Sequence, residues 1–170
     1  MPRPEVAHIA LTFADGTLGG MQFVTAIFST SGDVVASRAP TAEAVEEEIA
    51  KLETGLPAEK WPVRSWRFCA AEDFPVDRTY RDAWRDTGTE IIHDMAHARE
   101  IHREHLRRDR APILAALDVE YLRALEGTAK RTPGEVVSEK RRLRDITKHP
   151  AIDAAQTVEE LKAVRLEESV

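Results

Sequence analysis

The sequence predicts an α+β protein, with a small sheet-containing part followed by a longer helical part. Alternating apolar and polar residues between residues 6 and 70 are typical of strands. Beyond Asp94 the apolar residues recur with the period of a helix. Only 6% of the residues are aromatic whereas 32% are charged, a balance that suits exposed helices better than a thick β-sandwich.

Residues 6–13 are expected to form the first strand, because every second residue is apolar. The buried face of this strand is expected to consist of Ala7, Ile9, Leu11 and Phe13. Asp15-Gly16 then predicts a hairpin turn, since glycine accepts a positive φ. The return strand is expected over residues 21–29, with a bulge or loop where its alternation is imperfect, and residues 34–36 are a candidate continuation.

Residues 41–53 show the clearest short helical pattern. Thr41 is a favourable N-cap, and Gly55 ends the pattern. A third strand is expected over residues 63–70. The order of these elements predicts a ββαβ unit, which is a three-stranded sheet with one helix on a face.

A second hairpin is expected around Asp86-Thr87-Gly88, with arms over residues 79–84 and 89–93. The segment Asp73-Phe74-Pro75 before it has the composition of a linker. We therefore predict two domains, a small α+β domain of residues 1–76 and an appendage of residues 77–170. The appendage would contain this hairpin and a helical hairpin.

The longest helix is expected to run from Met95 to about Glu126, with Asp94 as its N-cap. Pro112 lies in its interior and removes one backbone hydrogen bond. We therefore expect either a kink at Pro112 or a break in which Asp109 caps a new helix.

Two apolar stripes follow Pro112 on nearly opposite sides of this helix. One consists of Leu114, Leu117, Tyr121 and Leu125, and the other of Ala115, Val119 and Leu122. A helix that is apolar on two sides needs two partners. The second stripe makes Val119 and Leu122 candidate partner-binding residues, and Trp84 joins them because aromatic side chains are enriched at interfaces.

The first stripe has a predicted partner within the chain. Residues 132–135 form a capping box with proline at the first helical position. The helix that follows is expected to fold back on the long helix through Val136, Leu143 and Ile146. A second capping box at residues 157–160 predicts a short last helix.

Histidines and acids near the start of the long helix form the only constellation that resembles a catalytic site. Its members are His93, His97, His102 and His105, with Asp94, Glu100 and Glu104. His93, His97 and Glu100 would lie within about 60° of one another on an unbroken helix, and such a set can bind zinc. However, His93 precedes the expected cap, and the His-Glu-x-x-His signature is absent. We therefore favour a solvated histidine-rich face, without metal or other cofactor, and keep the metal site as an alternative.

Composition argues against several functional classes. The formal net charge is −6, so no basic excess points to nucleic acid. Cys69 is the single cysteine, which excludes an internal disulfide, and we interpret it as a small apolar residue in a strand. We expect a protein that is made in the cytoplasm and does not bind a membrane, because neither a signal segment nor a run of 18 apolar residues is present. Catalytic loop motifs are also missing, which predicts a protein that is not an enzyme.

Five stretches in the second half of the sequence carry a resemblance to a known family. They are residues 77–84, 94–103, 110–119, 143–147 and 150–162. Residues 77–164 resemble the C-terminal region of small tail-module proteins of tailed bacteriophages and prophages. The resemblance implies a structural protein of the virion, made in the host cytoplasm, with other virion proteins as partners. We expect a homo-oligomer or a multi-copy assembly. A tail-fibre assembly chaperone and a metal-dependent enzyme are the alternatives.

Overall fold

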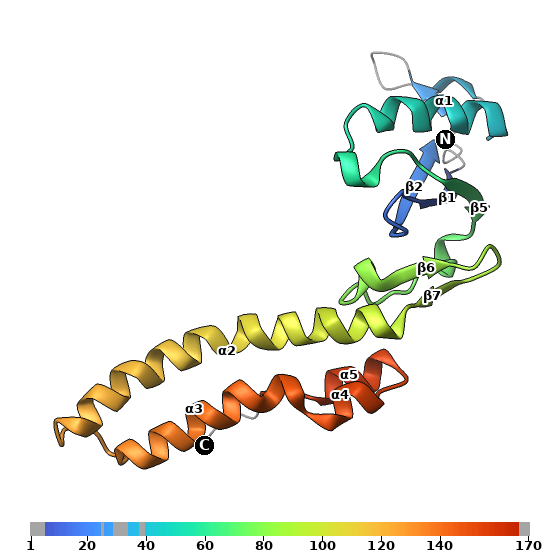
Figure 1. Cartoon of the computed structure of the whole chain (residues 1–170). Coiled ribbons are helices and arrows are strands. Elements are labelled where there is room, and N and C mark those ends of the chain that lie inside the picture. The colour runs from blue at the N-terminus through green and yellow to red at the C-terminus, as the bar shows by residue number, and fades with distance from the viewer. Residues whose placement is uncertain (1–5, 25, 29–33, 38–39, 167–170) are drawn as a thin grey trace. The chain divides into compact units, whose positions relative to one another are not determined.

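The structure is a computed structural model that describes residues 6–24, 26–28, 34–37 and 40–166 (Figure 1). The chain is a mixed α+β protein with a sheet and several helices. Contacts between residues divide it into two compact units, Met1–Asp94 and Met95–Val170, which are called the first and second units below.

The first unit contains a three-stranded antiparallel sheet with the order β2-β1-β5. Its strands are β1 (Val6–Thr12), β2 (Leu18–Val24) and β5 (Ser65–Cys69). The predicted turn is confirmed, because Gly16 has a φ of +80° and the Asp15 carboxylate accepts the Thr17 backbone N–H at 2.9 Å. The return strand starts at Leu18, earlier than expected.

The second part of the expected return strand belongs to another pairing. Strand β3 (Ala26–Phe28) pairs antiparallel with β4 (Val34–Ser37) in a separate two-stranded sheet. The segment 34–37 therefore faces β3 and does not lengthen β2. The end of the expected strand at Ser29 lies outside the described residues.

Helix α1 (Ala42–Glu53) supplies the core beneath the first sheet. Thr41 caps it as predicted, since the Ala44 backbone N–H donates to Thr41 Oγ1 at 3.3 Å. The core cluster consists of Ile9, Leu11, Phe23, Val45 and Ile49, with Ala7 and Phe13 packed against it. The predicted buried face of β1 is thus confirmed. Ala10, on the opposite face, is fully buried as well.

A second hairpin completes the first unit. It consists of β6 (Trp84–Asp86) and β7 (Ile91–His93), and Gly88 in its loop has a φ of +91°. Its first arm begins at Trp84 because residues 81–83 form the 3₁₀ turn η3 (Arg81–Ala83). Strand β6 contacts β1 and β2, so the compact unit extends to Asp94, beyond the boundary expected at residue 76.

Helix α2 (Met95–Leu125) runs through Pro112 without interruption, so of the two alternatives expected there the break at Asp109 is wrong. Figure 1 shows α2 as one gently bowed helix. Proline has no N–H, so Pro112 cannot donate to the carbonyl of Arg108 four residues earlier. The Arg108 side chain is 71% exposed. Solvent can hydrate a carbonyl on this side, which explains why one lost hydrogen bond does not end the helix.

The remaining helices of the second unit are α3 (Pro133–Asp145), α4 (Pro150–Ala154) and α5 (Val158–Ala163), with the 3₁₀ turn η4 (Ile146–Lys148) after α3. Both predicted capping boxes are present, at Thr132 and at Thr157. Helices α3 and α5 and the turn η4 contact α2. Within the described residues, no helix combines the length and the apolarity that a bilayer crossing requires.

The expected contact between α2 and α3 needs two corrections. Leu117, Val136 and Leu143 form the buried cluster, and Leu114 and Tyr121 pack against it. Leu125 is 60% exposed. Helix α3 begins at Pro133 and its Val136 packs with Leu117, so the buried cluster does not include the last turn of α2. Ile146 is half-buried in η4 rather than in α3.

Candidate functional site

Three arginines on one face of α2 bind the backbone of the segments that follow α2. Arg99 Nη2 donates to Ala155 O at 2.8 Å, and Arg103 Nε donates to Thr147 O at 3.3 Å. Arg110 Nη1 donates to Leu143 O at 3.1 Å, near the C-terminal end of α3. Hydrogen bonds from a charged donor are stronger than neutral ones, and the end of a helix attracts a cation. We call this side of α2 the inner face.

His102 also lies on the inner face, and it is only 6% exposed. Its Nε2 lies 3.0 Å from Val164 O, just beyond α5. Burial is the main reason why the pKa of His102 is lowered from its usual 6.5. The expected solvated histidine-rich face is therefore wrong at this residue, because the end of the chain covers it.

The candidate metal ligands lie on different elements and have protein partners. His93 lies in β7, before α2 as expected, and its Nε2 accepts a hydrogen bond from Trp84 Nε1 at 3.0 Å. His97 and Glu100 lie on α2, where Arg103 forms an ion pair with Glu100. Within the described part of the chain, no three His, Cys, Asp or Glu side chains are grouped so that they could hold one metal ion. The metal site stays an alternative that metal analysis of the purified protein can test.

Trp84 belongs to the interior of the first unit. It is only 6% exposed, its ring lies 6.1 Å from that of Phe74, and it pairs with His93 across the β6–β7 hairpin. This burial leaves little of Trp84 for a partner. Among the three candidate partner-binding residues, Val119 and Leu122 are the ones that reach the surface.

The exposed apolar residues on the other side of α2 form a continuous row. We call Pro112, Ala115, Val119 and Leu122 the outer stripe. Val119 is 50% and Leu122 is 59% exposed, and Pro112 and Ala115 are exposed too. Steps of three and four residues place all four on one side of a helix, roughly opposite Leu117, and this spacing is typical of helix–helix seams. The outer stripe is therefore a surface suited to a second helix.

The first unit carries an open hollow of about 700 Å³ beside β2. Its lining includes Phe74, Trp84 and His8, and Lys60, Arg78 and Arg81 give it a basic character. Lys60 is already bound to Thr17 Oγ1 at 2.6 Å and to the Asp15 carboxylate at 3.1 Å. No serine, threonine or cysteine appears among the described lining residues.

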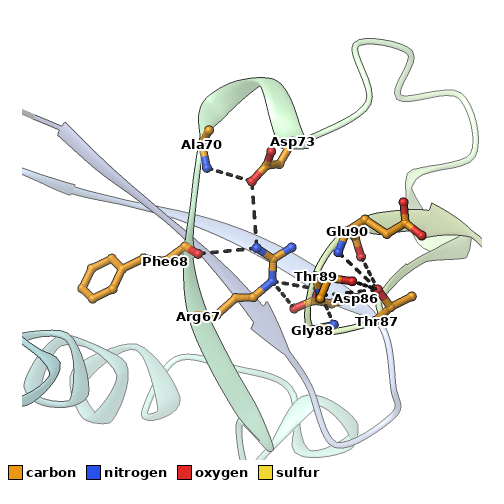
Figure 2. A network of polar contacts seen from close by, with 9 residues as sticks. All are labelled: Arg67, Phe68, Ala70, Asp73, Asp86, Thr87, Gly88, Thr89 and Glu90. Carbon is orange, nitrogen blue, oxygen red and sulfur yellow. Dashed lines mark hydrogen bonds and ion pairs between the residues drawn. The ribbon is translucent and has the colours of Figure 1, made fainter.

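A polar network joins β5 to the β6–β7 hairpin, as Figure 2 shows. Arg67 lies at its centre between the carboxylates of Asp86 and Asp73, and its Nη1 lies 3.9 Å from Asp73 Oδ2. Asp86 also accepts the backbone N–H of Gly88 at 3.0 Å. The network fixes the hairpin loop on the sheet, which is a structural role.

Sequence reasoning identified Ala115, Val119 and Leu122 of the outer stripe but missed the arginines of the inner face. The apolar period of Val119 and Leu122 is a local signal, and the structure shows both residues exposed. The arginines of the inner face resemble ordinary surface charges in the sequence. A signal for them does exist, because Arg99, Arg103 and Arg110 recur at the spacing that places them on the side of Leu117.

Comparisons of the chain with protein-family models, with curated proteins and with solved structures give no match. The geometry described above therefore carries the functional argument.

Proposed function

We propose that the protein is a non-enzymatic structural component of a bacteriophage tail or tail-fibre region, and that it docks on other virion proteins through its C-terminal helices. The proposed architecture is a ββαβ unit with a hairpin, followed by a helical hairpin that serves as the docking appendage. The observation that carries the docking role is the outer stripe, an exposed apolar row on a long helix. The virion role rests on the resemblance of residues 77–164.

The two sides of α2 support separate tasks. The inner face is occupied by Leu117 and by the arginines that hold the following segments. The outer stripe takes no part in the buried cluster around Leu117. Burial of its apolar side chains against a partner would be favourable, because it removes apolar surface from water. A helix that is stabilised from one side can present the other side to a partner, as helix-in-groove and helix–helix contacts require.

The experiment that tests this function compares virions that contain the wild-type protein with virions made with Leu122→Asp. We expect mass spectrometry to find the wild-type protein in purified particles and to find the Leu122→Asp variant depleted at least tenfold, because a charge in an apolar contact costs several kcal/mol. Circular dichroism should show that the variant is folded.

Ile113→Asp is the matched control. Ile113 is also on α2 and is 41% exposed, but it lies about half a turn away from Leu122 around the helix. This variant should enter particles normally. Absence of the wild-type protein from particles that nevertheless need it for assembly would favour the tail-fibre chaperone. Normal incorporation of Leu122→Asp would contradict docking through the outer stripe.

A further inference from the structure

We infer that the partner of the outer stripe is the outer stripe of a second copy of this chain, packed antiparallel to it. The inference rests on the proposed docking role of the stripe. It narrows the partner of the stripe from any virion protein to a second copy of this chain, and it adds the direction of packing. Three observations lead to it: the residues that flank the stripe, the symmetry of their order, and the separation of the stripe from α3.

Opposite charges flank the outer stripe. Arg108 lies one turn before Pro112, and Glu126 lies one turn after Leu122. The resulting series, 108, 112, 115, 119, 122 and 126, has steps of four and three residues throughout, so all its members lie on one side of the helix. Glu126 continues the helical geometry, since its N–H donates to Leu122 O at 3.1 Å.

This series is complementary to itself only in the antiparallel direction. With the two-fold axis halfway between Ala115 and Val119, each Ala115 faces Val119 of the second copy, and each Pro112 faces Leu122 of the second copy. Arg108 then faces Glu126 of the second copy at both ends of the contact. A parallel pair would bring Arg108 against Arg108 and Glu126 against Glu126, and such like-charge pairs disfavour it.

The flanking charges are available for this contact. The Arg108 side chain is 71% exposed, and its ion pair is with the adjacent Asp109 at 3.4 Å. Exposed neighbours in sequence give a weak ion pair, so Arg108 can turn to Glu126 of a second copy at little cost. Ala115 and Val119 at the centre are small enough for two helices to approach closely.

Helix α3 does not compete for this surface. It packs on Leu117 through Val136 and Leu143, on the opposite side of α2. A second copy would therefore add a helix to a side of α2 that the second unit leaves exposed, and α3 would keep its contacts with Leu117.

Sedimentation of the full-length protein over a range of concentrations tests the pairing. We expect a monomer–dimer equilibrium, weakened roughly tenfold by Arg108→Glu and likewise by Glu126→Arg. The double variant with both reversals restores opposite charges across an antiparallel contact, so it should dimerise like the wild type. A parallel contact would not respond in this way, because each reversal only replaces one like-charge pair by another.

Cysteine cross-linking in the Cys69→Ser background tests the direction independently. A mixture of Ala115→Cys and Val119→Cys chains should form a disulfide-linked heterodimer on mild oxidation, whereas either chain alone should cross-link poorly. Homodimers of each single variant would show a parallel contact and overturn the proposed direction. A protein that stays monomeric at every concentration would overturn the pairing itself.

The experiments distinguish failure of the self-pairing from failure of the proposed virion role. If the wild-type chain is monomeric but Leu122→Asp is still lost from particles, the self-pairing is wrong and docking on another virion protein stands. If the chain forms the antiparallel dimer but is found neither in particles nor in their assembly, the self-pairing stands and the virion role is wrong.

Discussion

Arg67 Nε lies 2.9 Å from Oδ1 and 3.0 Å from Oδ2 of Asp86, so one guanidinium joins β5 to the β6–β7 hairpin (Figure 2). The Arg67 side chain is 21% and the Asp86 side chain 9% exposed. An ion pair with so little solvent around it is costly to break from one side, since the remaining charge keeps its desolvation penalty. This relationship predicts how the first unit responds to mutation.

Asp86→Ala should destabilise the first unit by about 2 kcal/mol, because it leaves the Arg67 guanidinium partly buried without its main acceptor. Urea unfolding followed by tryptophan fluorescence measures this change. The double variant Arg67→Met with Asp86→Leu should recover most of the loss, because it removes both charges together. An Asp86→Ala protein within about 0.5 kcal/mol of wild type would show that the pair contributes no more than an exposed ion pair.

The ion pair between Arg67 and Asp86 also helps to define the C-terminal boundary of the first unit. The sequence predicts that residues 1–76 fold alone, but the structure groups residues 1–94 through the contacts of β6 with β1 and β2. We expect the fragment 1–94 to unfold cooperatively in urea. The fragment 1–76 should lose that cooperativity, because it lacks Asp86 and the hairpin strand β6 that contacts β1 and β2. A sharp, cooperative transition of fragment 1–76 would contradict this expectation and restore the boundary at residue 76.

Features that depend on residues close in sequence were predicted well. The Asp15-Gly16 turn and the caps at Thr41, Thr132 and Thr157 all formed as expected, because a turn or cap needs only a few neighbouring residues. The exposed outer stripe belongs to the same class, since helical periodicity over a few turns defines it.

Features that depend on distant residues were missed. The hydrogen bond of His102 with Val164 spans 62 positions, and the ion pair of Arg67 with Asp86 spans 19. No local pattern shows that a charged or polar side chain will meet such a partner. Trp84 was assigned to an interface for the same reason, because its neighbours Phe74 and His93 become visible only in the folded unit.

His102 predicts that the second unit loses stability in mild acid. Burial lowers the pKa of the folded His102 below 6.5, so the unfolded chain takes up the proton first as the pH falls. The contribution of neutral His102 is therefore fully present above about pH 6.5 and is lost progressively as the pH falls below it. Unfolding midpoints of the wild type should be lower at about pH 5.5 than at about pH 7.5.

His102→Gln identifies the group responsible for this pH dependence. Glutamine does not titrate and can still donate to the Val164 carbonyl. The variant should show a flatter pH dependence of the unfolding midpoint than the wild type between those two pH values. An unchanged slope in His102→Gln would assign the pH dependence to other groups.

The corrected position of Leu125 gives a matched pair of truncations on α2. Leu117 is 4% exposed in the cluster with Val136 and Leu143, whereas Leu125 is 60% exposed. Leu117→Ala should destabilise the second unit by about 3 kcal/mol, since it removes buried methyl groups and leaves a cavity. Leu125→Ala should change the free energy of unfolding by less than about 0.5 kcal/mol, as for other exposed positions. Thermal unfolding followed by circular dichroism compares the two. Equal losses of unfolding free energy in both variants would contradict this expectation. They would mean that α3 also packs on Leu125, as the sequence predicts.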